Sequence, residues 1–165
     1  MKISRIIKKI SLIIIIIVSL TEIGNAHLAH YENINKIEME ILRNGKVVGY
    51  NFYFFKRNNN ELIVTNQILL EVKVFGATVF KIEGYGEEKY LDDKLISYSS
   101  KTIQNDKKKF VNLIFNKKDN NFDIKGSSYT GKAHSKNIIG SWWNHKILQA
   151  SSQISPVSGS IKNQI

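Results

Sequence analysis

The residues best suited to metal chemistry lie near the start of the chain. His27 and His30 form a His-x-x-His pair, and cleavage after Ala26 would leave a free amine on His27 itself. With one distant histidine, such as His134 or His145, these nitrogens would suit Cu(II). The alternative is a frayed terminus that happens to contain histidines. Spacing alone does not bring a distant histidine back to the terminus, so we favour the alternative and expect no cofactor.

A set of carboxylates is the second candidate for chemistry. Glu83, Glu87 and Glu88 fall on one predicted strand, with Asp92 and Asp93 at its end. Glu83 and Glu87 share a face at even spacing, and a carboxylate pair can serve as acid and base. Such residues more often form the wet face of a sheet. The commonest local signatures of hydrolases and NTPases are absent from the sequence, so we assign no catalytic residue and favour a non-enzymatic protein.

Aromatic and hydroxyl side chains form the third candidate, a ligand pocket. Trp142 and Trp143 point in different directions on any short helix, so one could close an apolar interior while the other meets solvent or a ligand. The strand over 95–104 is polar on both faces, which predicts either an edge strand or the lining of a partly wet cavity. The predicted ligand-binding residues are Phe52, Phe54, Val72, Ser99, Thr102, Trp142 and Trp143.

Alternation of apolar and polar residues dominates the chain from Ile37 to Phe122. It predicts strands over 37–41, 47–55, 62–74, 78–91, 95–104, 110–116 and 122–126, separated by turns rich in Asn, Asp and Gly. The fold class is therefore all-β: an antiparallel β-barrel or a strongly curled meander. We expect a loop over 127–139 and a short C-terminal helix over 142–150, capped by Ser141, which closes one end.

The first 26 residues have the pattern of a secretory signal peptide. Basic residues precede an apolar stretch from Ile10 to Leu20, and Gly24-Asn25-Ala26 offers a small-residue cleavage site. We therefore expect a periplasmic or secreted protein cleaved near Ala26. The predicted organisation is a signal peptide over 1–26, a β-barrel-like domain with its closing helix over 27–152, and a polar C-terminal tail over 153–165. The chain has no cysteine for lipid attachment or disulfides.

The positive charge narrows the choice of partner. Removal of residues 1–26 reduces the net charge from +10 to +7. Export makes nucleic acid an unsuitable partner, although basic tracts are typical of proteins that bind it. Lys107–Lys109 and Lys117–Lys118 fall in predicted turns. They are solvated turn charges or, as the alternative, a peripheral contact with an anionic membrane surface.

Short motifs along the mature chain resemble those of a secreted bacterial family of uncharacterised activity, domain of unknown function 6134. In that family a late Trp pair follows a Glu-x-Trp, an Asp-Gly-x-Leu and a Ser-x-Thr strand. Here Tyr90 replaces the Trp of Glu-x-Trp, Asp93 replaces the Gly of Asp-Gly-x-Leu, and Asp106 replaces the Gly of an Asn-Gly turn. The resemblance implies a β-barrel-like periplasmic domain and no established activity. The matching segments are Gly45–Gly49, Val79–Ile82, Glu88–Tyr90, Asp92–Leu95, Ser100–Thr102 and Ser141–Asn144.

Our leading hypothesis is a non-enzymatic binding module for an apolar or amphipathic ligand, such as a lipid. The apolar part would be buried among Phe52, Phe54, Val72 and Trp142, and hydroxyls of Ser99 and Thr102 would orient it. The alternative is a structural or assembly protein of the cell envelope that recruits a partner through an edge strand. A hydrolase or a copper-binding protein is the least favoured interpretation.

Overall fold

The computed structural model describes residues 33–163, so the predicted signal peptide and the His27–His30 pair lie outside the described residues. The chain divides into two units, residues 1–34 and residues 35–165, and the second holds all the strands described. No helix within residues 33–163 is long and apolar enough to cross a membrane. The first eight strands are β1 (Lys36–Arg43), β2 (Lys46–Asn58), β3 (Glu61–Val74), β4 (Ala77–Leu91), β5 (Lys94–Gln104), β6 (Lys107–Asn116), β7 (Asn121–Gly126) and β8 (Thr130–His134).

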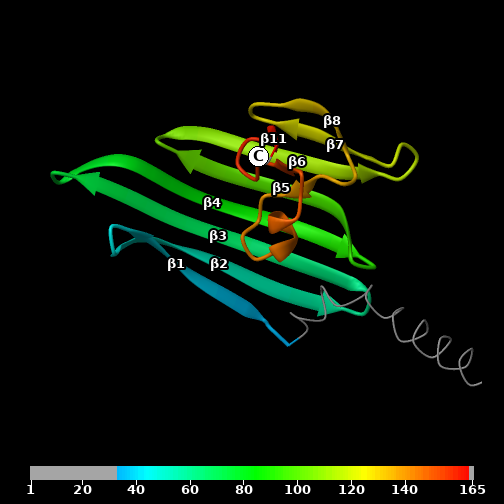
Figure 1. The fold of residues 1–165 in the computed structure, drawn as a ribbon, viewed down its shortest axis with the longest axis horizontal. Coiled ribbons are helices and arrows are strands. Elements are labelled where there is room, and N and C mark those ends of the chain that lie inside the picture. Colours follow the sequence, from blue (N-terminus) through cyan, green and yellow to red (C-terminus); the bar gives the residue numbers. More distant parts are fainter. Residues whose placement is uncertain (1–32, 164–165) are drawn as a thin grey trace, which may run out of the picture. The chain divides into compact units, whose positions relative to one another are not determined.

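These strands form one antiparallel meander in which each strand pairs with the next along the chain (Figure 1). The all-β meander is as predicted, but the sheet does not close into a barrel. Closure requires the first and last strands to pair, whereas β1 and β8 are the two edges of the sheet. The barrel alternative is therefore wrong. A separate C-terminal segment, and not the sheet's own closure, buries the apolar side chains of one face.

The register gives the sheet a covered face and an open face. Tyr53, Val64, Glu88, Tyr98 and Leu113 are buried at alternate positions of neighbouring strands and define the covered face. Their neighbours in sequence point to the open face and are mostly exposed or half-buried. The main apolar cluster lies between the covered face and the C-terminal segment over residues 135–163, and both contribute to it: Tyr98, Val111, Leu113, Phe122, Ile124, Ala133, Ile139 and Ile154.

The C-terminal segment, which we call the strap (residues 135–163), lies across the sheet in Figure 1. It contains β9 (Ile138–Ile139), the 3₁₀ turn η1 (His145–Leu148), β10 (Ser152–Ile154) and β11 (Ile161–Asn163). The three strands form a small sheet in the order β11-β10-β9, with β10 parallel to β9 and antiparallel to β11. The predicted polar tail over 153–165 thus includes most of β10, all of β11 and the fully buried Ile154.

Two local predictions differ from the structure in this region. The segment expected to be a loop, 127–139, contains β8 and β9. The expected helix over 142–150 is only the 3₁₀ turn η1, and Asn144 caps it by accepting a hydrogen bond from the Lys146 amide at 3.1 Å. Ser141 does not cap this turn because its hydroxyl donates to the Glu88 carboxylate instead.

The glycines of β4 have a packing role. The pairing of β4 with β3 and β5 runs through Gly84 and Gly86 without a bulge. A Cβ at Gly86 would lie 3.0 Å from the hydroxyl of Tyr98, so the absent side chain gives that ring room to lie across β4. The strand bulges occur elsewhere, including one at Lys89–Tyr90.

Candidate binding cleft

A cleft of about 730 Å³ lies where the strap meets the sheet at the turns that join β4 to β5 and β6 to β7. Leu95, Phe115 and Phe122 from the sheet and Ile138 and Ile139 from β9 form its apolar lining. Phe115 and Phe122 are paired across β6 and β7, with ring centroids 5.6 Å apart in an edge-to-face arrangement. The cleft therefore has walls from two layers and an aromatic floor.

Polar side chains surround the apolar lining. Lys94, Lys117 and Lys146 line the cleft together with Asp92 and Asp93. Within residues 33–163, none of the three lysine ammonium groups is part of an ion pair. They are therefore available to an anionic group of a ligand. Asp92 is partly engaged, because its Oδ1 accepts a hydrogen bond from the Asn60 side-chain amide at 2.9 Å.

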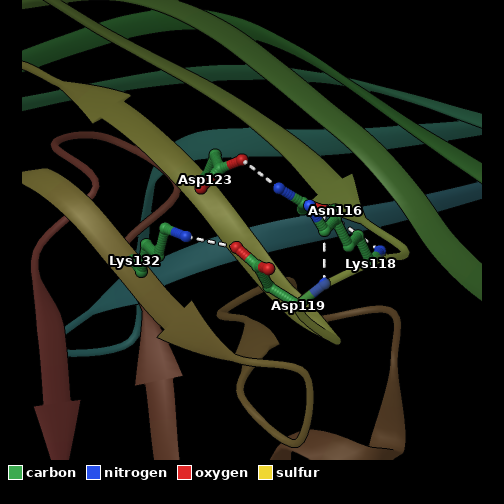
Figure 2. A network of polar contacts seen from close by, with 5 residues as sticks. All are labelled: Asn116, Lys118, Asp119, Asp123 and Lys132. Atoms are coloured by element: carbon green, nitrogen blue, oxygen red, sulfur yellow. Dashed lines mark hydrogen bonds and ion pairs between the residues drawn. The ribbon is translucent and has the colours of Figure 1, made fainter.

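The turn that carries Lys117 is held by a polar network (Figure 2). The Asn116 side-chain amide donates to Asp123 Oδ2 at 3.1 Å, and its oxygen accepts from the backbone amides of Lys118 at 3.1 Å and Asp119 at 3.4 Å. Lys132 on β8 is paired with Asp119, which raises the pKa of the lysine. The network fixes the β6–β7 turn, and so positions one side of the cleft.

A buried carboxylate lies beside the cleft at the centre of the covered face. Glu88 is 2% exposed, and it accepts hydrogen bonds from the Tyr90 hydroxyl, the Ser141 hydroxyl and the Trp143 indole, the last at 3.0 Å. Burial raises the pKa of this carboxyl, and the three donors oppose the shift without cancelling it. Burial also raises the pKa of Tyr90 well above its ordinary value, and the neighbouring Glu88 adds to the effect.

The Glu88 cluster joins the strap to the sheet, because two of its three donors belong to the strap. Trp143 is buried between Phe55 and Tyr90, with ring centroids at 5.3 Å and 6.0 Å. Nearby, the Trp142 backbone amide donates to the Tyr53 hydroxyl at 3.1 Å. Burial raises the pKa of Tyr53 to about 12. The Glu88 cluster is thus a polar anchor, since all three of its carboxylate contacts are to the fold itself.

The strap is anchored a second time over β5. The Tyr98 hydroxyl at 2.9 Å and the Ser100 hydroxyl at 2.6 Å both donate to the Pro156 carbonyl. The backbone of Ser158 passes so close to β7 that a Cβ at Gly126 would lie 2.5 Å from its oxygen. The polarity of this central strand, which the sequence left open between an edge and a wet cavity, thus serves to hold the strap.

The predicted ligand-binding residues are divided between the two faces of the sheet. Phe52, Phe54 and Ser99 lie on the open face, where Phe54 is exposed. Val72 and Thr102 are buried on the covered face with Trp143, while Trp142 is exposed. The structure therefore does not bring the seven side chains into one pocket, and none of them lines the cleft. These seven predicted ligand-binding residues are Phe52, Phe54, Val72, Ser99, Thr102, Trp142 and Trp143.

The carboxylates considered for catalysis are also separated. Glu83 and Glu87 do share the open face, but four residues along a strand place them about 13 Å apart. That distance is longer than the separation used by paired acid and base carboxylates. Glu88 faces the other way. Among the described residues no group of three His, Cys, Asp or Glu side chains could hold a metal ion; His27 and His30 lie outside them.

Sequence reasoning missed the cleft because its two walls are far apart in the chain. Phe115 and Phe122 were assigned correctly to strands, yet nothing local showed that β9 would pack over them. One signal was present: Ile138-Ile139, an apolar pair inside a segment expected to be a loop. A second hollow, about 640 Å³, lies on the open face near Leu69, Tyr85 and Phe110. Strands alone line it, without a second layer.

Fold and site together define a class: a single open β-meander whose C-terminal strap covers one face and forms an apolar cleft with it. The chain belongs to the family described as a domain of unknown function, DUF6134, whose model matches residues 39–165. That match covers both the meander and the strap. Neither the curated proteins nor the solved structures contain a significant match to the chain.

Proposed function

We propose that this domain is an exported, non-enzymatic binding module that holds an apolar or amphipathic molecule in the cleft between β4–β7 and the strap. The cleft itself carries the proposal. Its volume, about 730 Å³, lies in the range of small-molecule sites, and an apolar lining with a few polar groups is typical of such sites. The first 26 residues, with their export-signal pattern, support the location.

The apolar part of the ligand would lie against Leu95, Phe115 and Ile138. Each 100 Å² of apolar ligand surface withdrawn from water there contributes roughly 2.5 kcal/mol of favourable hydrophobic free energy. A polar or anionic head would remain among Lys94, Lys117 and Lys146. The ligand class is therefore a lipid or another amphiphile with a negatively charged end, and no cofactor is needed.

A matched pair of substitutions tests the location. Ile96 lines the cleft and Ile114 is exposed on the open face, so Ile96→Trp fills the site and Ile114→Trp adds the same ring elsewhere. The probes are N-phenyl-1-naphthylamine, which is uncharged, and 8-anilinonaphthalene-1-sulfonate, which is anionic. We expect Ile96→Trp to weaken both by about tenfold or more, and Ile114→Trp to leave both unchanged. Equal binding by the two variants would contradict the proposal.

An assembly role through an edge strand is a second candidate. Strand β1 offers eight residues, and within residues 33–163 it pairs on one side only. Such an edge can accept a further strand from a partner. Native mass spectrometry of protein isolated from its own envelope separates the candidates. A retained small amphiphile supports the cleft, whereas an added protein mass without one supports the edge.

A further inference from the structure

The hairpin that joins β3 to β4 extends beyond its neighbours. Strand β2 pairs with β3 only as far as Gly49–Leu70, and β5 pairs with β4 only as far as Ile82–Gln104. The hairpin continues through four further pairs, from Glu71–Lys81 to Val74–Ala77. It therefore projects as a two-stranded ribbon of about 13 Å. In Figure 1 this ribbon lies at the end of the sheet opposite the β4–β5 and β6–β7 turns, which line the cleft.

The tip of this ribbon carries an unusual residue. Phe75 and Gly76 both have positive φ, +50° and +82°, as a two-residue hairpin turn of this type requires. Every other non-glycine residue with positive φ in the described part is Asn or Asp, the residues that tolerate this conformation. Phe75 is also fully exposed, with the exposed Val74 and Val79 beside it. Neither its backbone conformation nor its exposure benefits the fold.

Basic side chains are concentrated on the ribbon and on the hairpin tips on either side of its base. Three neighbouring hairpin tips at this end of the sheet cover residues 40–47, 71–81 and 104–110. They contain seven basic residues, Arg43, Lys46, Lys73, Lys81 and Lys107–Lys109, against the three acids Glu40, Glu71 and Asp106. Glu71 is further engaged by the Thr78 hydroxyl, which donates to it at 2.7 Å, and by Lys73 at 3.3 Å. This end therefore attracts anions.

We propose that the β3–β4 tip inserts Phe75 into the surface of an anionic lipid bilayer. Apolar side chains flanked by lysines match the boundary between acyl chains and anionic head groups, where each feature meets its favourable surroundings. A fluid apolar phase accepts a projecting ring without a shaped socket, which a folded partner would have to supply. The proposal is independent of the ligand cleft, which lies at the other end of the sheet.

The test uses the exported, processed protein and sedimentation with vesicles of equal parts phosphatidylglycerol and phosphatidylcholine. Phe75→Asn places at the turn a residue that suits positive φ, so the variant should fold and melt at the same or a higher temperature than the wild type. We expect its affinity for these vesicles to fall by about tenfold or more. The matched control is Leu148→Asn, which removes another highly exposed apolar side chain, on η1, and should bind as the wild type does.

The electrostatic part has its own variant. Lys107→Glu combined with Lys108→Glu reverses two charges at the neighbouring tip and should weaken binding, and binding by the wild type should fall as salt rises. Vesicles of pure phosphatidylcholine should bind little. Three results would each overturn the proposal: no binding to the anionic vesicles, equal binding by wild type and Phe75→Asn, or an equal loss in Leu148→Asn. If the protein does not bind the anionic vesicles, a protein partner becomes the alternative occupant of the tip.

Discussion

Glu88 shows that a glutamate of the kind found in active sites can instead stabilise the fold. A buried carboxyl with a raised pKa is a typical signature of an active site. Here two of its three donors, Ser141 and Trp143, join β4 to the strap, and the third, Tyr90, lies on β4 itself. The sequence placed Glu88 on a strand beside Glu87 and Glu83, and strand alternation put it on the face opposite to both. What alternation could not show was which face the strap would cover.

The raised pKa of Glu88 predicts how stability depends on pH. A carboxyl whose folded pKa is higher than its unfolded value stabilises the fold fully below the unfolded pKa, and this contribution is lost as pH rises through the folded pKa. Wild-type stability should thus fall, relative to Glu88→Gln, from about pH 4.3 upward. Urea unfolding midpoints of both proteins across that range measure the effect. A stability difference that does not change with pH would contradict it.

The truncation Glu88→Ala has a different expected result. It leaves the Trp143 indole and two hydroxyls without their acceptor in a dry site, so we expect a loss of about 3 kcal/mol or more in the free energy of unfolding. Glu87→Ala is the matched control, because Glu87 lies next in sequence but on the open face. It should change stability by less than about 0.5 kcal/mol. Similar losses of unfolding free energy in both variants would contradict the anchoring role of Glu88.

At the scale of elements, strands were predictable and the strap was not. The β1–β7 strands follow from alternation, and their turns follow from Asn, Asp and Gly at positions that need positive φ. The strap depends on contacts between distant parts of the chain, such as Pro156 with Tyr98 and Ser100. Local patterns do not record such contacts, so β8 and β9 were expected to be a loop and η1 a longer helix.

The anchoring of the strap over β5 gives a prediction at this scale. Ser100→Ala removes a donor to the Pro156 carbonyl and should cost about 1 kcal/mol, whereas Ser99→Ala, one residue away on the open face, should cost almost nothing. Hydrogen exchange locates the change. Amides of β10 should exchange faster in Ser100→Ala, while those of β6 keep their protection. Unchanged exchange in β10 would show that this contact does not hold the strap.

Substitution of Trp143 tests the anchoring of the strap near Glu88. Trp143→Ala removes a side chain packed against Phe55 and Tyr90 as well as a donor to Glu88, so we expect a loss of about 3–5 kcal/mol. Trp142→Ala is the control, because the Trp142 side chain, next to Trp143 in sequence, is exposed. Thermal unfolding of the two variants measures the difference. Equal melting temperatures would contradict the strap's packing as described.

At the scale of the whole domain, two features lie at opposite ends of one sheet. The cleft is formed where the strap meets the β4–β5 and β6–β7 turns, and the projecting Phe75 tip lies at the end with the β3–β4 turn. Successive alternating segments separated by short turns predicted a meander. The register of its outer strand pairs and the path of the strap decide where the cleft and the tip lie. The pocket residues proposed from sequence were divided between the faces for that reason.

Binding in the cleft is the central claim, and mapping a bound probe by NMR tests it most directly. The anionic probe 8-anilinonaphthalene-1-sulfonate is titrated into the ¹⁵N-labelled protein. We predict that the largest amide shift changes occur at Leu95, Phe115, Phe122 and Ile138, which come from both walls of the cleft. Shift changes confined to the open face or to the Phe75 tip, with those four amides unmoved, would contradict the account.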